Sequence, residues 1–122
     1  APGQILQLVR FTIPAHLKLP VHTHPGMQTA WLESGALRYT VVAGGPAIIV
    51  RAGRSQGTPG PAETLSAGHS TTFLPGDSWT EPAGMVHFAE NTGNEPVVIL
   101  VASLLEKDAP PSTVVNLATP TS

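Results

Sequence analysis

Short apolar runs separated by Gly and Pro form the main pattern of this 122-residue chain. Almost none keeps the period of an amphipathic helix for three turns; the one exception is a weak helical turn near residues 103–107. Runs of this length between turn residues are typical of β-strands, which predicts an all-β fold such as a sandwich, jelly roll or barrel. The predicted strands cover 4–13, 16–23, 29–32, 37–42, 48–51, 64–74, 78–81, 86–90 and 97–104.

The turn residues predict how these strands are connected. Ser34-Gly35 separates the third and fourth strands, so we expect residues 29–42 to form a hairpin. Residues 53–61 have no apolar anchor and should form an exposed loop. The chain length suits one domain, which we place at residues 1–108. Residues 109–122 are a tail rich in Pro, Ser and Thr, in which Val114-Val115 could dock on a neighbouring strand edge.

Composition excludes several classes of function. Charged residues make up 11% of the chain, and the six Lys and Arg residues are scattered, so no basic stripe is present to bind nucleic acid. The longest apolar run, around residues 97–105, is too short to cross a bilayer, and we expect no membrane partner. The absence of Cys removes disulfides and thiolate ligands. The chain starts at Ala1, which is compatible with a removed N-terminal segment and leaves the compartment, cytoplasmic or exported, open.

Three histidines carry the candidate chemistry. His22 and His24 are two residues apart in an extended segment, so their side chains share a face. That spacing lets both imidazoles reach one metal ion at roughly 2.0–2.1 Å. Much later, a Pro82-x-Gly84 turn precedes His87, whose imidazole could meet the first two. Taken alone, His22 and His24 could equally be surface residues of a strand.

These residues lie within two motifs. HTHPGMQTAWLESG (residues 22–35) and GDSWTEPAGMVHFAEN (residues 76–91) resemble the two conserved motifs of the cupin family, and in particular those of small bacterial single-domain cupins. The resemblance implies a cupin β-barrel, also called a double-stranded β-helix or jelly roll, that holds one divalent metal ion. It implies His22, His24, Gln28 and His87 as the metal ligands.

Gln28 departs from the family pattern, in which a glutamate usually stands at this position. An amide oxygen is a weaker ligand than a carboxylate, so the site would keep more of the ion's positive charge and favour anionic ligands. Glu81, directly before Pro82, could compensate as a fourth ligand or act as a general base, and it is our candidate catalytic residue. The alternative for Glu81 is a surface carboxylate in a turn.

The remaining motif residues are better explained by structure than by chemistry. Glycines at turns commonly need a positive φ, which we expect of Gly35, Gly76 and Gly84. Asn91 should cap backbone groups, and Asp77 should bond turn amides. Strand parity places Trp31 outside the pocket and Trp79 on the same face as Glu81. Phe73 and Phe88 should pack in the core or an interface, and His16 and His69 have no motif partner.

The resemblance implies a metal-dependent enzyme on a small molecule bound in the barrel mouth. Fe, Mn, Ni, Co, Cu and Zn all suit three imidazoles. A redox metal implies dioxygenase-like chemistry on an enolisable or phenolic substrate, and Zn would support an isomerase, cyclase or lyase instead. A non-catalytic cupin that binds a small ligand is a further alternative. Small cupins commonly pair, so we expect a homodimer, with strand 4–13 as an edge available for pairing.

Overall fold

The computed structural model describes residues 2–53 and 60–115 and consists of strands, turns and loops over those ranges. No helix of the described residues is long and apolar enough to cross a membrane. The strands are β1 (Gln4–Ile13), β2 (Lys18–Thr23), β3 (Gly26–Ser34), β4 (Leu37–Ala43), β5 (Ala47–Val50), β6 (Ala62–Leu65), β7 (Ser70–Phe73), β8 (Ser78–Glu81), β9 (Val86–Glu90), β10 (Val97–Glu106) and β11 (Thr113–Val114).

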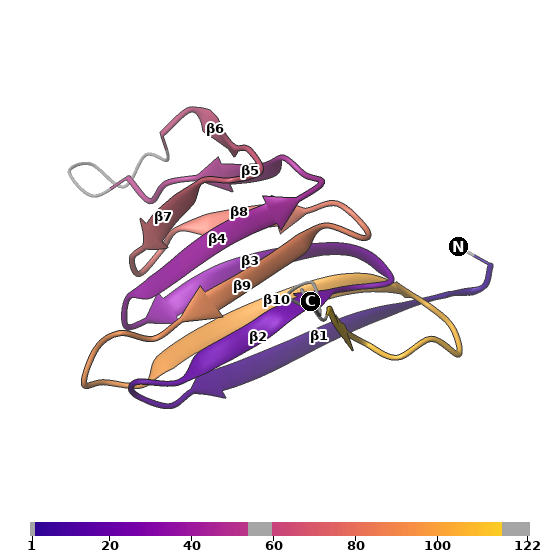
Figure 1. Cartoon of the computed structure of the whole chain (residues 1–122), viewed down its shortest axis with the longest axis horizontal. Coiled ribbons are helices and arrows are strands. Elements are labelled where there is room, and N and C mark those ends of the chain that lie inside the picture. Colours follow the sequence, from indigo (N-terminus) through magenta and orange to yellow (C-terminus); the bar gives the residue numbers. More distant parts are fainter. Residues whose placement is uncertain (1, 54–59, 116–122) are drawn as a thin grey trace, which may run out of the picture.

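Two antiparallel sheets face each other (Figure 1). One sheet has six strands in the order β1-β10-β3-β8-β5-β6, and the other has five in the order β11-β2-β9-β4-β7. Successive strands in the chain mostly alternate between the sheets, so most pairs join segments far apart in sequence. This arrangement is the predicted all-β jelly roll.

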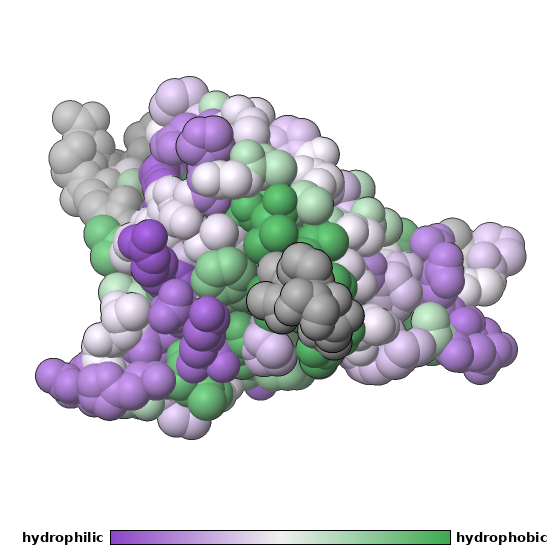
Figure 2. Space-filling model, viewed as in Figure 1, coloured by the Kyte–Doolittle hydropathy of each residue, from purple (hydrophilic) through white to green (hydrophobic). Residues whose placement is uncertain are grey.

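The core fills the space between the sheets. Alternate residues of the long strands point inward: in β10, every second residue from Val97 to Leu105 is buried. Leu32, Leu37, Val41 and Phe73 are fully buried and belong to this core. Figure 2 shows hydrophobic residues also gathered in the middle of one face, with hydrophilic residues toward both ends of the molecule.

The predicted hairpin at residues 29–42 is wrong. β3 pairs with β10 and β8, whereas β4 pairs with β7 and β9 in the other sheet. The chain crosses between the sheets at Gly35, which has a φ of 88°. A Cβ at Gly35 would lie 2.8 Å from the carbonyl oxygen of Pro96, so the crossing needs glycine both for its φ and for this close approach. A hairpin and a crossing present the same alternation of apolar residues, and the sequence pattern does not separate them.

Two further expectations change, and one is confirmed. The predicted strand at 64–74 is divided into β6 and β7, which lie in different sheets, by a turn that includes Gly68 with a φ of 87°. The helical turn near 103–107 is wrong, because β10 stays extended and pairs with β1 as far as Glu106. The docking of Val114 is confirmed, since β11 pairs with β2. Of the predicted loop at 53–61, residues 54–59 lie outside the described residues.

Candidate metal centre

Three histidines meet between the two sheets. His22 in β2 and His87 in β9 are paired across the strands, and His24 directly follows β2. The ring centroid of His22 lies 4.2 Å from that of His87 and 4.8 Å from that of His24, and the centroids of His24 and His87 are 5.1 Å apart. One ligand atom from each lies within 4.8 Å of the others. The three side chains form a group that could hold a metal ion, as the motif spacing predicts.

Backbone carbonyls fix the orientation of all three rings. The Nδ1 atoms of His22, His24 and His87 lie 2.7, 2.9 and 3.1 Å from the carbonyl oxygens of Pro20, Pro111 and Met85. A carbonyl only accepts, so each Nδ1 carries the proton and donates it. The lone pair of each Nε2 is then free for a metal, which is the arrangement usual for metal-binding histidines.

Burial keeps two of these rings neutral. His87 is 2% exposed. Desolvation lowers the pKa of His87, and the nearby charge of Glu81 only partly offsets it. Desolvation also lowers the pKa of His24, against opposing effects of its bond to Pro111 and the charge of Glu81. A metal binds the neutral imidazole, so the environment holds both rings in the binding form near neutral pH.

The carboxylate of Glu81 lies beside the histidines. Its Oε2 is 3.4 Å from Nε2 of His87, and its Oε1 is 3.8 Å from Nε2 of His24. Glu81 is 5% exposed, so it is not the surface carboxylate of the alternative interpretation. It ends β8, where alternation turns its side chain inward together with that of Trp79.

Three donors surround this carboxylate. Oε2 accepts hydrogen bonds from the hydroxyl of Tyr39 at 2.5 Å and from Nε1 of Trp79 at 3.2 Å, and Oε1 accepts one from Nε2 of Gln28 at 3.2 Å. Burial, together with the charge of Glu81, raises the pKa of Tyr39, so its hydroxyl keeps its proton and remains a donor. These contacts suit an ionised carboxylate, which can only accept.

Gln28 lies in the centre of this network. On β3 it is paired with Ser103 of β10 on one side and with Glu81 of β8 on the other. Its Oε1 accepts a hydrogen bond of 2.7 Å from the hydroxyl of Ser103, while its Nε2 faces Glu81. The amide oxygen predicted to bind the metal is therefore engaged with Ser103, and the role of Gln28 as a ligand stays a prediction.

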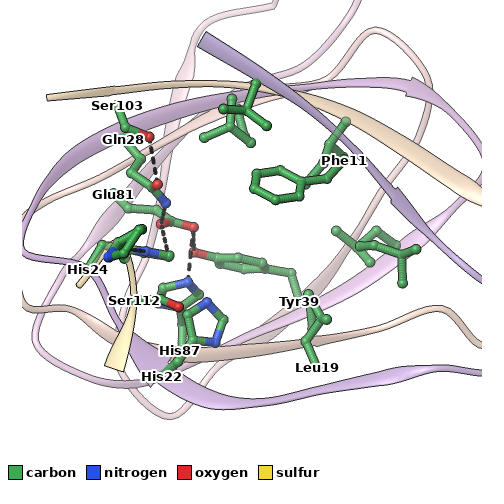
Figure 3. Close-up of a pocket in the computed structure, with 18 of the residues that line it drawn as sticks. Phe11, Leu19, His22, His24, Gln28, Tyr39, Glu81, His87, Ser103 and Ser112 are labelled. Carbon is green, nitrogen blue, oxygen red and sulfur yellow. Dashed lines mark hydrogen bonds and ion pairs between the residues drawn. The ribbon is translucent and has the colours of Figure 1, made fainter. Parts of the chain in front are cut away.

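A cavity of about 300 Å³ adjoins the histidines. Figure 3 shows the three imidazoles, Glu81 and Gln28 toward one side of it and Phe11 and Leu19 toward the other. The C-terminal segment contributes Pro111, Ser112 and Val114 to the lining, although the sequence suggests a tail beyond the barrel.

The other motif residues have the expected structural roles. Gly76 and Gly84 adopt φ values of 91° and 76°. Asn91 bonds the carbonyls of Ile13 and Glu95 and so ties two chain segments together. Asp77 accepts bonds from the amides of Ala52 and Leu74, and from Arg51 at 3.1 Å.

Parity places the two tryptophans correctly. Trp31 is 41% exposed on the outer face, whereas Trp79 is 2% exposed and stacks on Phe73 with ring centroids 3.9 Å apart. Phe88 lies under the ammonium group of Lys18, which is 4.7 Å from the ring centroid.

Sequence reasoning missed Tyr39, Ser103 and the backbone carbonyls that orient the histidines, of which that of Pro111 is the most distant in sequence. Tyr39 lies between Leu37 and Val41 in an alternating buried series, a signal that could have placed it inside. Ser103 follows the same parity in β10. The carbonyl of Pro111 has no sequence signal, because any residue supplies a carbonyl and only the path of the chain puts it beside His24.

Comparison with known proteins gives a family and a fold. The profile of the family described as Cupin matches residues 7–120. No curated protein matches significantly. Two solved structures of Bacillus subtilis oxalate decarboxylase, one studied for its Mn(II) centres and one at pH 4.6, superpose with TM-scores of 0.60 and 0.59 at 23% identity. Each match covers 91% of this chain but 24% of that enzyme, so this chain spans about a quarter of its length. At this identity the likeness shows the shared fold, and the profile match over nearly the whole chain shows that the protein belongs to the cupin family.

Proposed function

We propose that this cupin is a metal-dependent enzyme acting on a small enolisable or phenolic molecule. The observation that carries the proposal is the set of three imidazoles whose Nδ1 atoms donate to backbone carbonyls, with the Glu81 carboxylate beside Nε2 of His24 and His87. Nitrogen and carboxylate ligands in this combination suit first-row divalent metals. The Mn(II) centres of the structurally similar oxalate decarboxylase support the same class of ion.

In this proposal Glu81 is the fourth ligand. Two atoms that each lie roughly 2.1 Å from one ion are separated by about 3.0–3.4 Å at octahedral or tetrahedral angles. The separations of Glu81 from Nε2 of His87 and His24, 3.4 and 3.8 Å, are close to this range. Gln28 then serves as a positioning residue: it orients Glu81 through its amide nitrogen and is itself oriented by Ser103.

The protein's own groups would bind and orient the substrate beside the ion. A bound redox metal would supply dioxygenase-like chemistry, and any of these metals would polarise a substrate oxygen as a Lewis acid. The donors Tyr39 and Trp79 keep Glu81 in place. Apolar side chains such as Leu19 and Val101 line the rest of the cavity and limit access of water.

A second candidate is non-redox isomerase, cyclase or lyase chemistry at Zn(II), with Glu81 as the general base. It is favoured by the position of Glu81 on the cavity wall, where its carboxylate could take a proton from a bound substrate. In this case the three histidines alone would bind the ion. Replacement of Glu81 would then reduce turnover more than it reduces metal binding.

Metal analysis and oxygen uptake test the proposal. The protein purified without chelators should contain about one divalent ion per chain, and His87→Ala should lose most of it. The protein loaded with Fe(II) should consume oxygen with diketone or phenolic substrates. A metal-free preparation that takes up no divalent ion would refute the proposal. Metal uptake without oxygen consumption would argue against a dioxygenase. Turnover assays with the Zn(II)-loaded protein would then distinguish the second candidate from a role in ligand binding alone.

We propose a homodimer as the assembly. β1 lies at the edge of the six-stranded sheet, where no strand of the described residues pairs with its outer side and a second copy could be added. Leu6 and Leu8, on this strand, are 78% and 73% exposed. Exposure of these apolar side chains to water is energetically unfavourable.

A further inference from the structure

The cavity beside the histidines has a polar end and an apolar end, and the strand register explains this division. On the six-stranded sheet, Gln7, Ser103, Gln28 and Glu81 are paired in one row across β1, β10, β3 and β8. The next row that lines the cavity contains Val9, Val101 and Ala30, and the one after it contains Ile99 and Phe11, which is 49% exposed.

The opposite sheet is divided in the same way. His22 and His87 are paired in one row, and Leu19 and Ala89 are paired in another, with Tyr39 next to Ala89. Polar residues thus face polar residues and apolar residues face apolar ones. Figure 3 shows the result, with Phe11 and Leu19 on the far side of the cavity from the histidines. A ligand that fills this cavity needs a polar group next to the histidines, which we call its head. It also needs an apolar part at the opposite end of the cavity, which we call its body.

The charges of the cavity limit the charge of that head. No Lys or Arg is among the described residues that line the cavity, and Glu81 supplies one negative charge. A divalent ion held by three neutral histidines and Glu81 leaves one positive charge. A monoanion neutralises it, whereas a dianion leaves a buried negative charge without a cationic partner, which is unfavourable in apolar surroundings.

We infer that the cavity selects a monoanionic chelating molecule with an apolar body, such as the enolate of an aryl diketone, over small dicarboxylates. This inference rests on the proposed function, because the metal ion is part of the site. The cavity volume of about 300 Å³ is at the lower end of the range for ligand pockets and suits one small molecule.

Titration of ligands into the Zn(II)-loaded protein tests the inference without electron transfer. The probes are 1-phenylbutane-1,3-dione, pentane-2,4-dione, oxalate and malonate. The two diketones share a chelating head, so the phenyl group should tighten binding about tenfold by burying apolar area. Both dicarboxylates should bind at least tenfold more weakly than the phenyl diketone. Equal or tighter binding of oxalate or malonate would overturn the inference.

A matched pair of variants locates the apolar body. Phe11→Ser should weaken binding of the phenyl diketone several-fold and leave pentane-2,4-dione unchanged, since only the larger probe reaches that side. Arg10→Ser is the control, because Arg10 lies next to Phe11 but bonds Glu33 on the outer face. An equal effect of Phe11→Ser on both diketones would contradict the assigned position. The comparison of probes on the unmodified protein stands even if a variant fails to fold.

The two proposals fail in distinguishable ways. Failure of the proposed function appears as absence of metal uptake, before any ligand is added. Failure of the present inference appears as normal metal uptake with a preference for dicarboxylates or with no gain from the phenyl group.

Discussion

Gln28 and Glu81 face each other across β3 and β8, and the amide nitrogen of Gln28 donates a 3.2 Å hydrogen bond to the Glu81 carboxylate. The cupin motif usually places its glutamate at the position of Gln28. In this protein a carboxylate instead reaches the histidines from the neighbouring strand, and an amide replaces it at the usual position. We interpret the pair as an exchange of positions: the carboxylate usual on the strand of Gln28, β3, lies here on the neighbouring strand, β8.

Glu81→Gln should weaken metal binding because it removes the charge and retains the shape. Replacement of a residue that contacts a metal ligand typically lowers metal affinity by about 10–100-fold. We expect a loss of affinity in this range or larger, measured in a competition assay with a chelating dye. Glu33→Gln is the control, since Glu33 is on β3 but pairs with Arg10 at the surface. Equal affinities for the two variants would exclude Glu81 as a ligand.

Gln28→Leu should destabilise the metal-free protein. The change leaves Ser103, which is 4% exposed, and one oxygen of Glu81 without their partners. An unsatisfied buried polar group costs about 1–3 kcal/mol, which urea unfolding should detect. Thr29→Val, one residue along β3, removes the exposed bond to Thr80 and should cost less than about 1 kcal/mol. A similar loss in both variants would argue against a special role for Gln28.

Deletion of residues 111–122 should weaken metal binding through His24. The carbonyl of Pro111 fixes the ring of His24, and loss of such outer contacts typically costs about 10–100-fold in affinity. Pro111→Ala keeps a carbonyl at this position and should keep the affinity. Circular dichroism of the truncated protein checks that it folds, and unchanged affinity in the folded truncated protein would show that Pro111 is dispensable.

The metal-free protein should lose stability as the pH falls below the ordinary histidine pKa of 6.5. His24 and His87 have lowered pKa values in the folded state, so the unfolded chain binds more protons in this range. The stability is fully present above pH 6.5 and is lost progressively toward the folded pKa values. Urea midpoints at several pH values measure this effect, and His87→Asn should reduce the slope. A stability that rises on acidification would contradict the assignment.

Leu8→Lys should shift the proposed dimer toward monomer. It places a charge on the exposed apolar side of the edge strand β1. Chromatography with light scattering at several concentrations gives the mass. The control is Ile48→Lys, which changes a residue 39% exposed on β5, away from that edge. A monomeric unmodified protein would refute the dimer directly.

The sequence by itself determined which residues face inward and which positions need turn conformations. Alternation placed Trp79 and Glu81 on the inner face and Trp31 on the outer one, because successive side chains of a strand point to opposite sides. The spacing of His22 and His24, with the motif around His87, was sufficient to predict their convergence. These properties depend on local geometry, which a few neighbouring residues fix.

Only the tertiary structure decided which strands are neighbours. The chain crosses between sheets after β3, so Gln28 lies between Ser103 and Glu81, 75 and 53 residues away in sequence. The same long-range packing brings the Pro111 carbonyl to His24 across 87 residues. Such contacts follow from the joint burial of both sheets, which depends on the whole chain at once and leaves no local pattern to read.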